Sequence, residues 1–146
     1  MAKQTLDGIP AERWSRIHEL ALGYANSVSK GRYVAAERAR RQVLQALNRL
    51  QSRYGPRPSI LATKGEYVKR PSQRERLLLD AFASAQHQKD TKNLTLICSS
   101  LAEFYADEAV DLAKARKWLK QLEKALVYHF DKAESEVLET LKKRLK

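Results

Sequence analysis

Apolar residues recur every three or four positions through most of the chain, which is the spacing of an amphipathic α-helix. In residues 10–29 and 32–53 they follow one helical face each, and Gly31 and Gly55 end the two segments. The spacing continues through four later segments, residues 72–89, 92–107, 112–128 and 131–145. The pattern predicts an all-α fold of six to seven helices, arranged as stacked antiparallel helical hairpins.

Residues 56–71 are ambiguous, because three prolines bracket a stretch with room for only a short helix over residues 59–67. An ordered loop would fit equally well. We expect one all-α domain, residues 1–146, built from three helix pairs and a last helix. These are residues 10–54, 58–89 and 92–128, with the C-terminal helix at 131–145.

Two of the later segments begin with the spacing of a capping box, in which a first residue accepts from the first-turn amides and a Glu three residues on reaches back. Ser72 with Glu75 and Asp131 with Glu134 have this spacing. The sequence therefore predicts helix starts at both places.

The chain contains an internal repeat. The pattern Leu-Ala-x-x-Tyr-Ala occurs at residues 20–25 and again at 101–106, an offset of 81 residues, and Ala36 in the following helix matches Ala115 at an offset of 79. Small Ala residues opposite Tyr or Leu let two helices approach closely, and stacking such pairs buries faces that one pair leaves exposed. Units of about 40 residues are indicated.

This pattern resembles a divergent tetratricopeptide-like (TPR-like) helical repeat, most closely over residues 101–126. The resemblance implies hairpins stacked in a right-handed superhelix that serves as a protein-interaction module. The chain departs from the family at Arg40, where a large apolar residue is usual, and in its longer repeats. Without the resemblance, the same periodicity describes a plain helical bundle.

The charge of the chain is strongly uneven. Its 146 residues include 28 Lys and Arg against 17 Asp and Glu, a formal net charge of +11. Residues 1–73 hold 14 of these cations and 5 anions, a net +9, whereas residues 74–146 hold 14 and 12, a net +2. Excess positive charge is therefore a property of the first half.

The densest part of this charge lies on the segment 32–53. Four arginines recur at helical spacing opposite its apolar face, Arg38, Arg41, Arg49 and Arg53. Arg57, Lys64, Lys69, Arg70, Arg74 and Arg76 continue the positive character into the next segments. Arg40 lies off the stripe, among apolar positions; either it extends past the edge of the core, or it pairs with a carboxylate or a bound peptide.

Guanidinium groups hold carboxylates and phosphates in a bidentate manner, so an arginine stripe indicates an anionic partner. We expect a non-enzymatic protein-interaction module that binds an acidic protein or an extended peptide through Arg38, Arg40, Arg41, Arg49 and Arg53. The alternatives are a nucleic-acid-binding protein that uses the same face, and a solvated face without a ligand. Nucleic acid is the weaker alternative because no recognition motif accompanies the charge.

No catalytic, metal or cofactor site is expected. The three histidines are far apart, and neither a phosphate loop nor a nucleophile elbow occurs. Cys98 is the single cysteine and is expected to be a buried thiol. We see no signal peptide or membrane span, and expect a cytoplasmic protein. The last helix or a second copy of the chain, in a homodimer, would cover the end of the stack.

Overall fold

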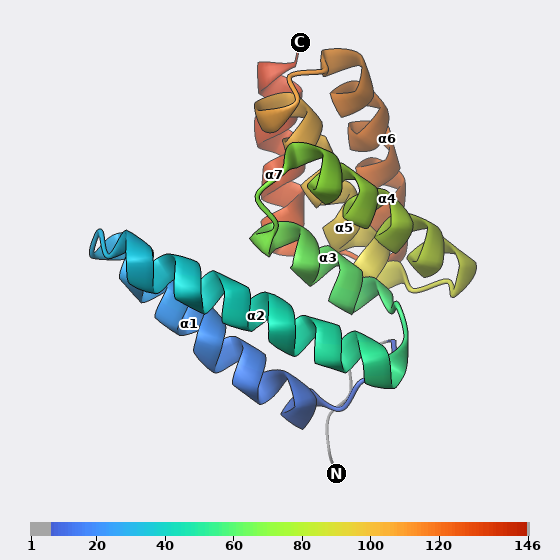
Figure 1. Cartoon of the computed structure of the whole chain (residues 1–146). Coiled ribbons are helices and arrows are strands. Elements are labelled where there is room, and N and C mark those ends of the chain that lie inside the picture. The colour runs from blue at the N-terminus through green and yellow to red at the C-terminus, as the bar shows by residue number, and fades with distance from the viewer. Residues whose placement is uncertain (1–6, 146) are drawn as a thin grey trace.

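The protein is all-helical, as its periodicity predicted (Figure 1). The structure, a computed structural model, describes residues 7–145, and over these it has seven α-helices and no strand. The helices are α1 (Ser15–Ser29), α2 (Tyr33–Tyr54), α3 (Pro58–Tyr67), α4 (Pro71–His87), α5 (Thr91–Glu103), α6 (Leu112–Tyr128) and α7 (Lys132–Arg144). Among them, none is long and apolar enough to cross a bilayer.

The ends of the first two helices follow the sequence signals closely. A 3-10 turn, Ala11–Trp14, precedes α1, so the segment predicted from residue 10 begins with a tighter turn than an α-helix. Gly31 and Gly55 have φ angles of 70° and 82°. Both sit just after a helix in the left-handed region, where a residue without Cβ carries little strain.

The ambiguous segment 56–71 contains a helix, α3, which begins at Pro58. Proline fits the first helical position because its missing N–H has no partner there and its φ is already helical. Asp7 accepts a hydrogen bond from the Ser59 amide at 2.7 Å. Arg57 donates to the carbonyls of Tyr54 and Asp7, at 2.8 and 2.9 Å, and so ties Asp7 to the α2–α3 connection.

The capping prediction at Ser72 is wrong, and the one at Asp131 is confirmed. Helix α4 starts at Pro71 after the N-cap residue Arg70, so Ser72 already lies inside the helix. Proline at the first helical position sets this start without a side-chain cap. Asp131 accepts from the amide of Glu134 at 3.1 Å, as its spacing predicted.

Helix α5 ends earlier than residue 107, because a π-helical turn, Phe104–Glu108, follows it. Three side chains of this turn contact other helices. Tyr105 donates to Glu75 of α4 at 2.7 Å, Asp107 accepts from Arg144 of α7 at 2.5 Å, and Glu108 pairs with Arg74 of α4. Side chains of the widened turn therefore contact both α4 and α7.

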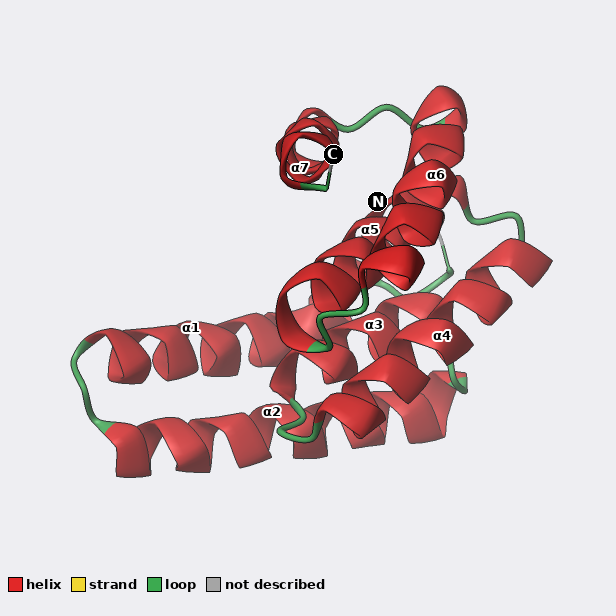
Figure 2. Cartoon of the chain, turned by 90° about the horizontal axis from the view of Figure 1, so that it is seen from above, coloured by secondary structure: helices red, strands yellow, loops and turns green. Residues whose placement is uncertain are grey.

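Helix α3 stands between two apolar cores. Ile60 packs with Trp14, Ile17 and residues of α2, whereas the next residue, Leu61, packs with the larger core of α4 to α7. In Figures 1 and 2 the α1–α2 hairpin lies across one side of this larger body, and its turn at residues 30–32 projects beyond it. The hairpin therefore presents much of its surface to solvent.

Neighbouring helices in the chain pack on one another, α1 on α2, α3 on α4 and α5 on α6. Gly65 of α3 is buried, and a Cβ added there would lie 3.6 Å from Leu78 of α4. Ala36 and Ala115, which match one another in the internal repeat, are both buried.

Candidate functional site

Helix α2 buries one face and exposes the other. Its buried residues are Ala36, Val43, Leu47 and Leu50. Four arginines on the opposite side are exposed, and we call them the arginine face: Arg38, Arg41, Arg49 and Arg53. At 1.5 Å of rise per residue the face is about 22 Å long. The helical spacing seen in the sequence therefore corresponds to one continuous surface.

At the C-terminal end of α2, the arginine face borders a groove of about 530 Å³ between α1 and α2. Arg49 and Arg53 line it from α2, and Arg13 and Arg16 from the opposite side. Its apolar floor is formed by Ile17, Ala46 and Leu50. Of the described residues that line the groove, none is acidic. Four guanidinium groups thus surround an apolar floor.

Arg13 and Arg16 did not stand out in the sequence analysis. They are three positions apart, as neighbours on a helix face are, but two cations alone do not define a basic surface in a sequence. Only the packing of α1 against α2 brings them to Arg49 and Arg53. Arg16 has a weak, exposed pair with Glu19, with an N–O distance of 3.4 Å.

The N-terminal end of the arginine face is shallower and more mixed in character. Arg38 and Arg41 line a depression with Tyr33 and Val34, whose side chains are 74% and 80% exposed. Arg41 also donates to Glu37 at 3.2 Å. This end offers exposed aromatic and aliphatic groups beside its cations.

Arg40 does not belong to the arginine face. Its guanidinium donates to both carboxylate oxygens of Glu37, at 2.9 and 2.7 Å, and to the backbone carbonyl of Tyr67 at 2.9 Å. Only 16% of its side chain is exposed. Of the two interpretations of this residue, pairing with a carboxylate is the one observed. The hydrogen bond from Arg40 to the Tyr67 carbonyl joins α2 to the end of α3.

Glu37 is the acidic centre of this small network. Besides Arg40, it pairs with Lys69 at 3.2 Å and Arg41. The hydrogen bond from Arg40 is the largest cause that lowers the pKa of Glu37 to about 2, and Lys69 adds to it. The carboxylate is therefore charged at neutral pH and offsets part of the charge at this end of α2.

Three of the cations expected to continue the basic surface after α2 are engaged within the fold. Arg57 is held by backbone carbonyls of the chain. Arg74 donates to the carbonyls of Gly65 and Val68, at 2.7 and 2.9 Å, and pairs with Glu108. Lys64 donates to Gln51 at 2.9 Å. These cations tie helices together instead of facing an external ligand.

The remaining candidate chemistry is sparse. Cys98 is 1% exposed, and burial raises the pKa of its thiol to about 12, so it is the buried thiol that was expected. Within residues 7–145, no group of three or more His, Cys, Asp and Glu side chains could hold a metal ion. The arginine face is the surface that most clearly suits a ligand.

No family model, curated protein or solved structure matches this chain. The resemblance to tetratricopeptide repeats therefore stays a prediction.

Proposed function

We propose that this protein is a non-enzymatic protein-interaction module that binds an acidic or extended segment of a partner protein through the arginine face. The observation that carries the proposal is the groove between α1 and α2, where Arg13, Arg16, Arg49 and Arg53 surround an apolar floor. Guanidinium groups bind carboxylates in a bidentate manner, and arginine is enriched at protein interfaces.

The apolar floor favours a peptide over a nucleic-acid backbone. A segment that alternates acidic and apolar side chains places carboxylates on the arginines and an apolar group on Ile17, Ala46 and Leu50. The exposed Tyr33 and Val34 at the other end add a second apolar contact beside Arg38 and Arg41. A phosphate backbone would use the charges and leave both apolar areas unused.

The proposal is tested with a fluorescein-labelled peptide of repeating Asp-Glu-Leu, followed by fluorescence anisotropy at low salt. The double variant R49E/R53E reverses two charges of the groove and is expected to weaken binding by at least about tenfold. A matched control is K120E/K124E, which changes the net charge equally at two exposed lysines of α6.

The control should bind the peptide within about twofold of the unaltered chain. If both variants lose binding to the same extent, only the net charge matters and the proposed surface is wrong. The nucleic-acid alternative is tested in the same assay with a labelled duplex. It requires binding to the duplex that is tighter than to the peptide and that falls log-linearly with salt concentration.

A further inference from the structure

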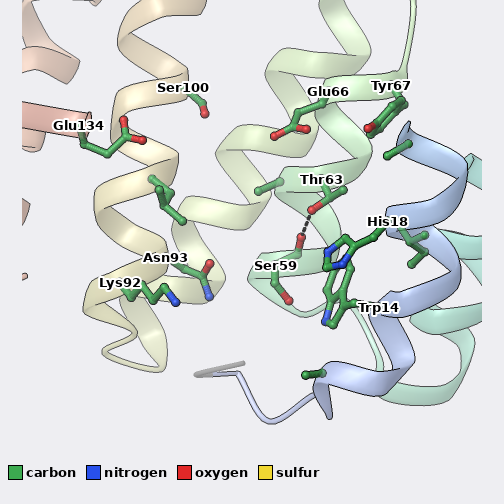
Figure 3. A pocket seen from close by; sticks show the side chains of 15 residues that line it. Trp14, His18, Ser59, Thr63, Glu66, Tyr67, Lys92, Asn93, Ser100 and Glu134 are labelled. Atoms are coloured by element: carbon green, nitrogen blue, oxygen red, sulfur yellow. Dashed lines mark hydrogen bonds between the residues drawn. The ribbon is translucent and has the colours of Figure 1, made fainter. Parts of the chain in front are cut away.

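A cleft of about 540 Å³ lies on a different part of the molecule, where α1, α3 and α5 face one another (Figure 3). Polar and aromatic groups line it along its whole length. These are Trp14 and His18 on the α1 side, Ser59, Thr63, Glu66 and Tyr67 on α3, and Lys92, Asn93 and Ser100 on α5, with Glu134 of α7. Its volume is in the usual range for small-molecule sites.

One end of the cleft has hydrogen-bond donors without acceptors. Within the described chain, Trp14 Nε1 and Ser59 Oγ are the two buried side-chain polar atoms that lack a partner. Trp14 is 7% exposed. Figure 3 shows both side chains at the same end as Lys92. A buried donor without an acceptor destabilises the folded protein, and an acceptor on a ligand would remove this cost.

Two aspartates that contact residues of the cleft do not accept from these donors. Asp7 accepts from the backbone amide of Ser59, and Asp90 accepts from the amide of Asn93 at 3.1 Å and from its side chain at 2.6 Å. Both aspartates therefore cap the first turns of α3 and α5. An additional oxygen is needed to satisfy Trp14 and the Ser59 hydroxyl.

The other end of the cleft is acidic. Glu66 and Glu134 line it, and Figure 3 shows both well away from the Trp14 end. Within residues 7–145 neither has an ion pair, although the chain has an excess of cations. Glu66 is exposed to solvent, and the protein atoms packed around its carboxyl raise its pKa. A bound cation would stabilise this charge.

The separation of the two ends selects the length of the ligand. From Ser59 to Glu66 along α3 there are seven residues, or about 10 Å at 1.5 Å of rise per residue. An extended peptide covers about 3.3–3.6 Å per residue, so two or three residues reach from one end to the other. The apolar residues Ala62 and Leu96 also line the cleft.

We propose that this cleft binds short zwitterionic peptides of two or three residues. The C-terminal carboxylate accepts from Trp14 Nε1 and Ser59 Oγ and lies beside Lys92, and the N-terminal ammonium lies between Glu66 and Glu134. Both donor atoms are buried, so the carboxylate reaches them only if the side chains at that end of the cleft shift. This site does not depend on the proposed function of the arginine face.

The test uses the full chain with Trp118→Phe, which leaves Trp14 as the one tryptophan. Trp118 is buried in the other core, against Phe82. The probes are the tripeptide Ala-Leu-Ala, its N-acetylated form and its C-terminal amide. The free tripeptide should change Trp14 fluorescence saturably, and each blocked form should bind about tenfold more weakly. Should W118F fail to fold, calorimetry of the unaltered chain replaces fluorescence.

Two variants assign the ends of the ligand. Glu66→Gln should weaken binding of the free tripeptide but leave binding of the N-acetylated form unchanged. Acetylation already removes the ammonium that Glu66 contacts, so the substitution removes no further contact. Lys92→Met should weaken binding of the free tripeptide but leave binding of the C-terminal amide unchanged, because the amide lacks the carboxylate that lies beside Lys92. R49E/R53E should retain full binding, which separates this site from the arginine face. Equal binding of all three probes, or no saturable change up to about 10 mM peptide, would overturn the proposal.

Discussion

Arg40 joins two helices by donating to the carboxylate of Glu37 on its own helix and to the carbonyl of Tyr67 at the end of α3. In the sequence, Arg40 lies between the buried residues Ala36 and Val43. A charged group at such a position is costly unless its donors are paired, and here three of the five N–H donors of Arg40 make hydrogen bonds.

Replacement of Arg40 by Ala should therefore destabilise the fold. Loss of the charge-assisted hydrogen bond to the Tyr67 carbonyl and of the packed side-chain stem should cost about 1–2 kcal/mol in the free energy of unfolding. Urea denaturation followed by circular dichroism measures this change. Arg41→Ala is the matched control, because Arg41 is exposed and makes one peripheral contact, and its effect should stay below about 0.5 kcal/mol.

The pair also predicts a dependence of stability on pH. The pKa of Glu37 is lowered from 4.5 to about 2, chiefly by the hydrogen bond from Arg40. A carboxyl whose pKa is lower in the folded state binds its proton more readily when unfolded, so its contribution is present above pH 4.5 and is lost as the pH falls toward 2.

Glu37→Gln removes this contribution at every pH. The difference in unfolding free energy between the unaltered chain and E37Q should therefore narrow steadily between pH 4.5 and 2. Urea titrations at intervals of half a pH unit measure it. A difference that stays constant across this range would show that the Glu37 carboxylate is not linked to folding.

Most of the helices could be predicted from the sequence because they depend on local signals. Residues 56–71, which contain α3, fitted a loop equally well. Periodicity located the apolar faces, and Gly31 and Gly55 marked two helix ends. The groove could not be predicted in full, because Arg13 joins Arg49 only through the packing of α1 on α2. Spacing along one helix indicates which residues share a face, but not which residues a neighbouring helix brings to it.

The partner of Arg40 also could not be predicted from the sequence. Its position among apolar residues separated it from the stripe, yet its partner at Tyr67 is 27 residues away. The π-helical turn after Glu103 was also not foreseen. Tyr105 and Glu108 contact α4, and such tertiary contacts are absent from a local pattern.

Two glycines should respond to alanine in opposite directions. Gly23 lies in the interior of α1, and a Cβ added there meets no atom within 4 Å, so G23A should stabilise the protein by about 0.5–1 kcal/mol through the higher helix propensity of alanine. Gly31 has a φ of 70°, so G31A should destabilise it by about 1 kcal/mol. Thermal unfolding distinguishes these outcomes. A similar shift for both would contradict the conformation of the turn at Gly31.

The starts of α4 and α7 allow a comparison of two capping-box sequences, of which only one acts as a cap. Asp131 accepts from the Glu134 amide, so Asp131→Ala should lower the free energy of unfolding by about 1 kcal/mol. Ser72 is exposed and lies after Pro71 in α4, where it caps no amide, so Ser72→Ala should change stability by less than about 0.3 kcal/mol. Urea denaturation of the two variants in parallel measures both effects. A loss at Ser72 as large as that at Asp131 would mean that α4 begins two residues later in solution, at Gln73, and that Ser72 caps it.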